Sequence, residues 1–142
     1  MNLSVVIPLI NEQNSLEELV SSISSVISEI NLNYEIILID DGSTDKSWEI
    51  ISKLCALDQN IKGIRFLKNF GKSQALSAGF KASKGEVVIT MDADLQDDPK
   101  EIPELYNKIV IENFDLVSGW KKVRFDSILF KNIPSKIFNL AA

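Results

Sequence analysis

The sequence predicts an α/β protein in which helices flank a mainly parallel sheet, and three observations support this prediction. Short apolar runs rich in β-branched residues alternate with segments of helical periodicity along the 142 residues. The apolar runs are hydrophobic on both faces, as in strands buried within a parallel sheet. Polar residues follow these runs directly, at the edge where open α/β sheets bind ligands. The expected architecture is therefore Rossmann-like.

The first strand and helix are the clearest elements. LSVVIPLI, residues 3–10, is short and apolar on both faces, which is typical of a buried strand. A helix is expected from Ser15 onward, because Leu16, Leu19 and Ile23 recur at helical spacing. This pair begins a strand–helix alternation, which predicts a parallel sheet covered by helices.

The second unit is YEIILID, residues 34–40, followed by a GST turn and a helix over residues 45–57. Pro99 suits the first turn of the last expected helix. The other expected strands are residues 61–67, 85–94 and 114–119, and the other expected helices are residues 71–82 and 99–112. Five strands and four helices make one domain with a substantial core.

Composition excludes several classes of protein. The net charge of −5 argues against a nucleic acid partner. The chain has no histidine and one cysteine, Cys55, which excludes a Ser-His-Asp triad, a Cys-His dyad and a histidine or cysteine-cluster metal site within it. One cysteine fits a reducing, cytoplasmic compartment, and there is no signal peptide pattern and no apolar run near the roughly 20 residues that cross a bilayer. The remaining chemistry uses carboxylates, Lys or Arg, amides, hydroxyls or a hard metal ion.

DDGSTD follows the second strand. Ser43 or Thr44 is expected to cap the next helix, with Asp45 in its first turn. Capping explains Asp40 and Asp41 less well. Carboxylates at a strand end accept hydrogen bonds from a base N–H or a ribose hydroxyl, so a nucleotide contact is the alternative.

ITMDADLQDDP ends the fourth strand with a concentration of acid. If the chain stays extended, Asp92, Asp94 and Gln96 face one side and form an open oxygen site for a divalent cation. Mg²⁺ or Mn²⁺ bridging a nucleoside diphosphate would complete such a site. Asp97 and Asp98 are better explained as the polar entrance to the helix at Pro99.

Two basic segments leave alternatives open. Lys68 and Lys72 flank Gly71 at an expected helix start and could hold an anion, although that Ala- and Ser-rich helix could simply be closely packed. No GxGxxG or Walker A pattern is present. Lys121 and Arg124 form either an exposed basic turn or a phosphate contact.

Four segments together resemble a known family. VVIPLINE, IILIDDGSTD, KNFGKSQALSAGFKASKGEVVITMDADLQDDP and FDLVSGWKK resemble the family 2 inverting glycosyltransferases, in the branch of dolichyl-phosphate mannose synthase and bacterial polyprenyl-phosphate glycosyltransferases. The order and spacing match over nearly the whole chain. The resemblance implies a GT-A fold, a UDP- or GDP-linked sugar donor and a divalent metal.

The resemblance also implies site residues. Asp94 and Gln96 would be metal ligands, and Lys121 would contact phosphate, so Asp94 and Lys121 are the expected catalytic residues. Ile10 departs from the family, which often has Tyr there to stack on the nucleotide. The residues expected in the nucleotide pocket are Pro8, Ile10, Glu12, Ile39, Asp41, Asp92 and Ala93.

The function expected from this resemblance is transfer of a sugar from a nucleotide diphosphate sugar to a polyprenyl phosphate. Transfer to a sugar hydroxyl in polysaccharide or lipopolysaccharide synthesis is the alternative, as is a donor-binding module inactive as a fragment. Residues 1–142 are expected to be the N-terminal, nucleotide-sugar-binding part, truncated before the acceptor-binding part. The basic C-terminal end would suit the cytoplasmic face of a membrane. A homo-oligomer is left open.

Two other classes fit less well. A sugar-phosphate nucleotidyltransferase would carry a glycine-rich loop with Arg or Lys after the first strand, where this chain has LINEQNS. A phosphoacceptor receiver domain needs an Asp at the end of its third strand, and IRFLKNF has none.

Overall fold

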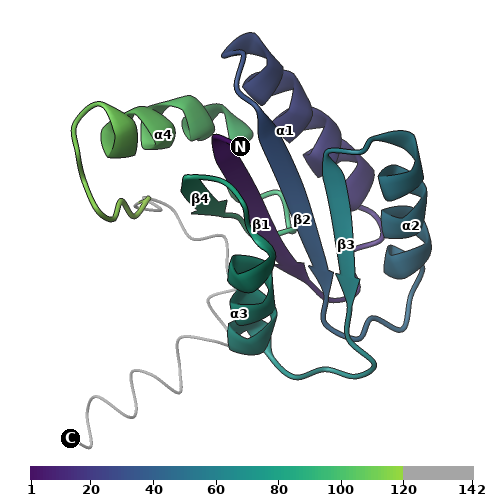
Figure 1. Ribbon diagram of the computed structural model, residues 1–142. Helices are drawn as coiled ribbons and strands as arrows, with labels where there is room; N and C mark the ends of the chain where they lie inside the picture. Colours follow the sequence, from purple (N-terminus) through teal and green to yellow (C-terminus); the bar gives the residue numbers. More distant parts are fainter. Residues whose placement is uncertain (120–142) are drawn as a thin grey trace, which may run out of the picture.

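The structure, a computed structural model, describes residues 1–119 and has a four-stranded parallel sheet in the order β3-β2-β1-β4 (Figure 1). Its strands are β1 (Leu3–Leu9), β2 (Tyr34–Asp40), β3 (Ile61–Arg65) and β4 (Val87–Thr90). Its helices are α1 (Leu16–Glu29), α2 (Ser47–Leu57), α3 (Lys72–Ala82), the 3₁₀ turn η1 (Pro99–Glu101) and α4 (Ile102–Val110). The expected α/β alternation is confirmed.

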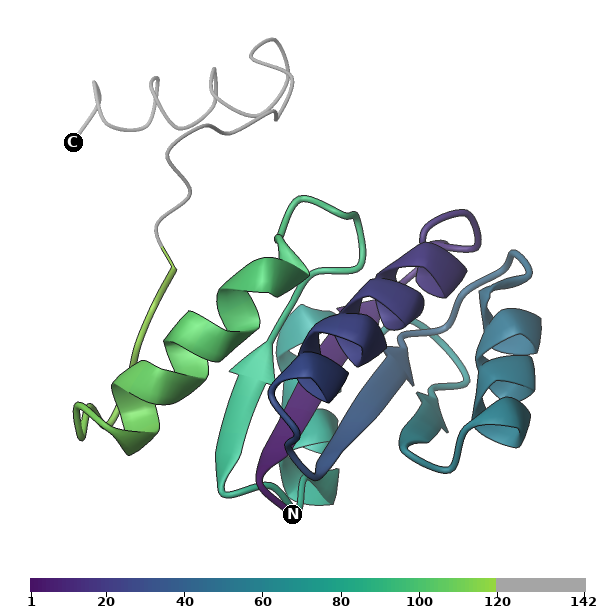
Figure 2. The same ribbon diagram turned by 90° about the horizontal axis from the view of Figure 1, so that it is seen from above.

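Helices cover both faces of the sheet. Seen from above, α4, α1 and α2 lie side by side on one face, and α3 lies behind the sheet (Figure 2). Alternate residues of β1 therefore enter different cores: Val5 and Ile7 pack under α1, while Val6 packs with Ala75 of α3. All three β1 residues are fully buried, which explains why the sequence shows no polar alternation here.

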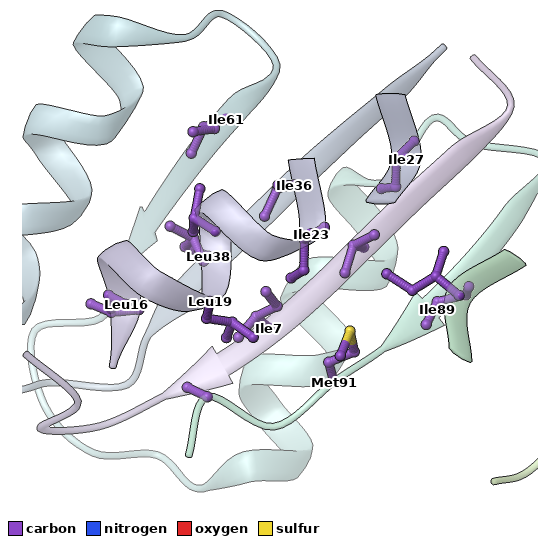
Figure 3. Close-up of a cluster of buried hydrophobic side chains, with 14 of the residues drawn as sticks. Ile7, Leu16, Leu19, Ile23, Ile27, Ile36, Leu38, Ile61, Ile89 and Met91 are labelled. Atoms are coloured by element: carbon purple, nitrogen blue, oxygen red, sulfur yellow. The ribbon is translucent and has the colours of Figure 1, made fainter. Parts of the chain in front are cut away.

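The larger core lies between α1 and the sheet (Figure 3). Leu19 and Ile23 of α1 meet Ile7 of β1 and Leu38 of β2 in one buried cluster. A smaller core under α3 depends on Gly79, whose missing Cβ would lie 2.4 Å from Val6 Cγ1. This close approach holds α3 against the sheet and fixes where its N-terminus lies.

The prediction of a fifth strand at residues 114–119 is wrong. This segment forms no strand, and Leu116 is 84% exposed. A strand needs a hydrogen-bonding neighbour, and in residues 1–119 β4 pairs only with β1. A cavity of about 990 Å³ separates the segment from β4 and is lined by both. FDLVSG thus has the apolar pattern of a strand but pairs with no neighbouring strand among the described residues.

Most other boundaries lie close to the predictions. Residues 34–40 match β2 at both ends, and β1 ends one residue early. The prediction that residues 91–94 continue the fourth strand is wrong, because the ladder ends where Met91 N–H donates to Val6 O at 3.1 Å. The expected caps of α2 are also wrong: Lys46 is the N-cap residue and supplies no side-chain hydrogen bond.

Candidate functional site

The candidate site lies at the carboxyl ends of the strands, where four loops meet. These loops follow β1, β2, β3 and β4 in turn, and they contain the polar residues that the sequence placed at strand ends. In Figure 1 the arrowheads of β1, β2 and β3 point toward this edge. Hydrogen bonds between the loops give the edge a defined shape.

The loops after β1 and β2 are joined through Asn11, which adopts a left-handed conformation with φ of 57°. Its N–H donates to Ser43 Oγ at 2.9 Å, and its side-chain oxygen accepts from Thr44 N–H at 2.9 Å. Next to it, Glu12 N–H donates to Ser47 Oγ at 2.9 Å. Ser43 and Thr44 therefore bind the neighbouring loop instead of capping α2.

Asp45 strengthens this link. One carboxylate oxygen accepts from Ser47 N–H at 2.9 Å, and the other accepts from Gln13 N–H at 3.2 Å. Burial alone would raise the pKa of Asp45, but hydrogen bonds from Ser47 and Gln13 outweigh burial and hold its pKa below the usual value. The carboxylate therefore stays ionised and keeps the two loops together.

Asp41 holds the loop after β3. Its carboxylate is buried, with the residue 4% exposed, and its two oxygens accept from Phe70 N–H at 2.8 Å and Gly71 N–H at 2.9 Å. The loop passes so close to Gly42 that a Cβ there would lie 2.5 Å from the Lys68 carbonyl carbon. Asp41 and Gly42 together set the path of residues 66–71.

Asp40 is fully buried beside Asp41. Its Oδ1 accepts from Ser43 N–H at 2.8 Å, whereas its Oδ2 has no hydrogen-bond partner among the residues that the structure describes. Arg65 Nε lies 3.7 Å from Oδ2 and provides charge compensation, while its guanidinium stacks over Trp48 at 5.4 Å. The arrangement gives Asp40 a structural role at the end of β2.

The acidic segment after β4 is a turn, so the prediction of an extended chain through Gln96 is wrong. Leu95 has φ of 61°, which reverses the chain direction. Asp92 N–H donates to Asp97 Oδ2 at 2.8 Å, and Gln96 N–H donates to Asp94 Oδ1 at 3.1 Å. Asp92, Asp94 and Gln96 therefore do not follow strand alternation, and hydrogen bonds from the backbone of the turn set their positions.

Asp98 fulfils its expected role and Asp97 does not. Asp98 is the N-cap residue of η1 and accepts from Lys100 N–H at 3.0 Å. The carboxylate of Asp97 closes the acidic turn onto Asp92 instead of serving the helix. Asp94 and Gln96 remain exposed at the outside of the turn.

The oxygen donors of this turn suit a hard cation but do not surround one. Within the described part of the chain, no three or more His, Cys, Asp or Glu side chains gather in a way that could hold a metal ion. Asp94 and Gln96 would provide a partial shell, of the kind that Mg²⁺ or Mn²⁺ completes with water or substrate phosphates. The donor set therefore fits an open site completed by a ligand.

The other residues expected in the nucleotide pocket differ in exposure. Pro8, Ile39 and Ala93 are buried and can shape only the floor of a site. Ile10 is 39% exposed, and Glu12 is partly buried, with its carboxylate accepting from Ser15 Oγ at 2.9 Å. Lys121 lies outside the described residues.

An ion pair between Lys72 and Asp92 was missed from the sequence. Lys72 Nζ, on the first residue of α3, pairs with Asp92 Oδ1. The sequence marked Lys72 as a residue at a helix start that could hold an anion. Only the fold shows that an anionic side chain of the chain itself lies within its reach.

Together, the βα order, the interlocked loops and the acidic turn after β4 define an α/β domain of the GT-A type. The chain belongs to the family described as Glycosyl transferase family 2, whose sequence pattern matches residues 4–141.

A curated relative has a related sequence over nearly all of the chain. This protein, undecaprenyl-phosphate 4-deoxy-4-formamido-L-arabinose transferase of Aeromonas hydrophila subsp. hydrophila, is 42% identical over 137 residues, which are 96% of this chain and 41% of the relative. The chain therefore spans about two fifths of the length of the curated relatives it matches.

Solved structures have the same fold. Glucosyl-3-phosphoglycerate synthase from Mycobacterium tuberculosis, in complex with Mn²⁺, UDP and phosphoglyceric acid, has a TM-score of 0.60 and 26% identity, covering 78% of this chain and 39% of that one. S. aureus TarS in complex with UDP-GlcNAc has a TM-score of 0.66 and 22% identity, covering 92% and 38%. No helix within residues 1–119 is long and apolar enough to cross a membrane.

Proposed function

We propose that this chain is the donor-binding part of a metal-dependent inverting glycosyltransferase that moves a sugar from a nucleotide diphosphate sugar to a polyprenyl phosphate. Family membership supports glycosyl transfer. The name of the A. hydrophila relative supports a polyprenyl phosphate acceptor. The observation that carries the proposal is the acidic turn after β4, which presents Asp94 and Gln96 at the ligand-binding edge.

The donor nucleoside would lie between the loops after β1, β2 and β4. Ile10 would supply apolar contact from the first of these loops, since it is 39% exposed. Asp92 and Asp41 would supply polar contacts, with Asp41 near the base. Pro8, Ile39 and Ala93 would form the floor, and Glu12 the rim.

The site must stabilise the negative charge of the leaving group. Nucleoside diphosphate departs with its negative charge, and a divalent cation supplies electrostatic stabilisation of that charge. Asp94 and Gln96 would hold the cation, and Lys121 would contact phosphate. Mg²⁺ or Mn²⁺ fits these oxygen donors, and Mn²⁺ is present in the related M. tuberculosis structure.

A phosphate acceptor suits a chain without histidine. The phosphate oxygen is already anionic, so attack on the sugar needs no general base. A sugar hydroxyl would need a carboxylate base to remove its proton. The name of the A. hydrophila relative favours the lipid phosphate, and the reaction would then take place at a membrane, on its cytoplasmic face in our proposal.

Calorimetric titration tests the donor site directly. UDP, GDP and their sugars are titrated with and without Mn²⁺ into the wild-type chain and into the Asp94→Ala and Glu29→Ala variants. Glu29 is an exposed carboxylate at the end of α1, so its variant controls for the loss of one negative charge. We expect Mn²⁺-dependent binding of one nucleotide class, weakened by Asp94→Ala and unchanged by Glu29→Ala.

Two results would contradict the proposal. If nucleotides bind equally well with and without Mn²⁺ and Asp94→Ala does not change their affinity, the metal assignment is wrong. A folded chain that binds no nucleoside diphosphate would show that residues 1–142 do not form the donor site. Binding without transfer to a polyprenyl phosphate would leave a donor-binding module as the function of this chain.

A further inference from the structure

Lys72 places a positive charge on the acidic turn. Its Nζ pairs with Asp92 Oδ1, and the two side chains are 60% and 36% exposed. Both residues line the cavity of about 990 Å³ beside β4, together with Gln96 and Asp97. The pair therefore shares this cavity with Gln96, one of the two proposed metal ligands.

The fold fixes the base of the Lys72 side chain. Asp41 accepts from Gly71 N–H at 2.9 Å, directly before Lys72, and Asn69 Oδ1 accepts from the same N–H at 2.8 Å. Gly71 has φ of 94° and starts α3 without a side-chain cap. The backbone is thus held in place, while the four-carbon stem of lysine can still move its ammonium group.

The charge of Lys72 opposes that of a divalent cation at the same turn. Asp92 is two residues from Asp94, and the backbone contacts of the turn connect Asp92 with Asp97 and Asp94 with Gln96. A cation at Asp94 and the ammonium group at Asp92 would repel each other, and both draw on the negative charge of one short segment.

We propose that Lys72 is an internal counter-ion of the acidic turn: its ammonium group pairs with Asp92 in the absence of ligand and moves away when a divalent cation binds. The inference rests on the proposed function, because it takes the turn as the metal site. Lys72 then lowers the affinity of the turn for the cation alone. Its departure also removes the ammonium group from Asp92 Oδ1 at the step when the nucleoside would contact that carboxylate.

If the Lys72–Asp92 pair were an ordinary surface ion pair, we would expect a different result. The pair would add slightly to the stability of the fold, and its removal would leave cation binding unchanged or weaken it through disorder of the turn. An internal counter-ion has the opposite effect, since its removal strengthens cation binding. The sign of the change therefore separates the two roles.

The test is a titration of the chain with Mn²⁺ alone, followed by the electron paramagnetic resonance signal of free Mn²⁺. We compare wild type with Lys72→Met, Lys72→Arg and Lys81→Met. Lys81 is an exposed lysine in the last turn of α3, so its variant changes the net charge equally at the far end of the same helix. Lys72→Arg keeps the charge at the turn.

We expect Lys72→Met to bind Mn²⁺ about two- to fivefold more tightly than wild type, the range that an exposed ion pair allows. Lys72→Arg and Lys81→Met should stay close to wild type. The gain should shrink as salt is raised, because exposed charges are screened. Equal affinity of Lys72→Met and Lys81→Met, or weaker binding by Lys72→Met, would overturn the inference.

Nucleotide titrations separate this inference from the proposed function. If no variant binds Mn²⁺ alone while UDP or GDP still binds with Mn²⁺, the inference fails and the donor site stands. If Mn²⁺ and nucleotides both fail to bind, the proposed function fails with it.

Discussion

Replacing Asp41 with asparagine should loosen the loop after β3. Asp41 is 4% exposed, and its carboxylate accepts from Phe70 N–H at 2.8 Å and Gly71 N–H at 2.9 Å. Asparagine has one oxygen in place of two, so one N–H would keep its acceptor. The other N–H would face the amide NH₂ group, which is also a donor.

The size of the effect follows from these two contacts. A hydrogen bond to a charged acceptor contributes about 1.5–3 kcal/mol, and the Asp41 carboxylate accepts two. Asp41→Asn should therefore lower the free energy of unfolding by about 2–3 kcal/mol. Asp41→Ala removes both carboxylate oxygens, although Gly71 N–H keeps Asn69 Oδ1 as an acceptor, and should lower it by about 2–5 kcal/mol.

Urea denaturation measures the total loss, and amide hydrogen exchange locates it. Exchange at Phe70 and Gly71 should accelerate more than exchange within β1. Asp98→Asn is the matched control, because asparagine serves as well as aspartate at an N-cap, and it should change stability by less than about 0.5 kcal/mol. The reasoning is refuted if Asp41→Asn is as stable as this control and the two amides exchange no faster.

Three further predictions concern packing, pH and nucleotide contact. Gly79→Ala places a Cβ 2.4 Å from Val6 Cγ1, so it should destabilise the chain by about 1–3 kcal/mol in urea denaturation, and an unchanged midpoint would contradict the packing of α3. Burial would raise the pKa of Glu35, but hydrogen bonds from Lys62, Ser4 and the Lys84 N–H, together with the charge of Lys62, outweigh burial and lower it. A lowered pKa means that ionised Glu35 stabilises the fold above about pH 4.5 and that this stabilisation is lost as pH falls through the folded-state pKa. The wild type should therefore lose more free energy of unfolding than Glu35→Gln between pH 7 and pH 3.5 in urea denaturation. Equal losses would disprove this. Ile10→Tyr should tighten UDP binding by about 0.5–1.5 kcal/mol through stacking, measured by calorimetry, and leave pyrophosphate binding unchanged; weaker UDP binding would argue against a base beside Ile10.

The fold was predictable where the chain carries its own signals. The run of residues 34–40 has apolar, β-branched residues bounded by polar ones, and β2 has the same limits. The segment 114–119 has a similar pattern but forms no strand, because strand formation depends on a neighbour that the pattern cannot reveal. Local sequence thus indicates a tendency to form a strand, and pairing with a neighbouring strand decides whether the strand forms.

The sequence predicted where the candidate site lies in the fold, but it did not predict which residues contact one another there. Polar residues at strand ends predicted that several loops would meet at one edge of the sheet, and Asp41 lies at that edge directly after β2. That its carboxylate holds Phe70 depends on a contact across 29 residues, which spacing cannot show. The turn at Leu95 was hidden for a different reason, since a left-handed leucine gives no sequence signal.

The sheet order has a consequence for folding during synthesis on the ribosome. β1 lies between β2 and β4, and Leu3 pairs with Tyr34 on one side and with Val87 on the other. The ribosome adds roughly 5–20 residues per second, so β1 waits about 3–10 s after Tyr34 before its second neighbour is made. During this time the most buried strand of the domain has an unpaired edge, and chaperone binding to nascent chains should peak there.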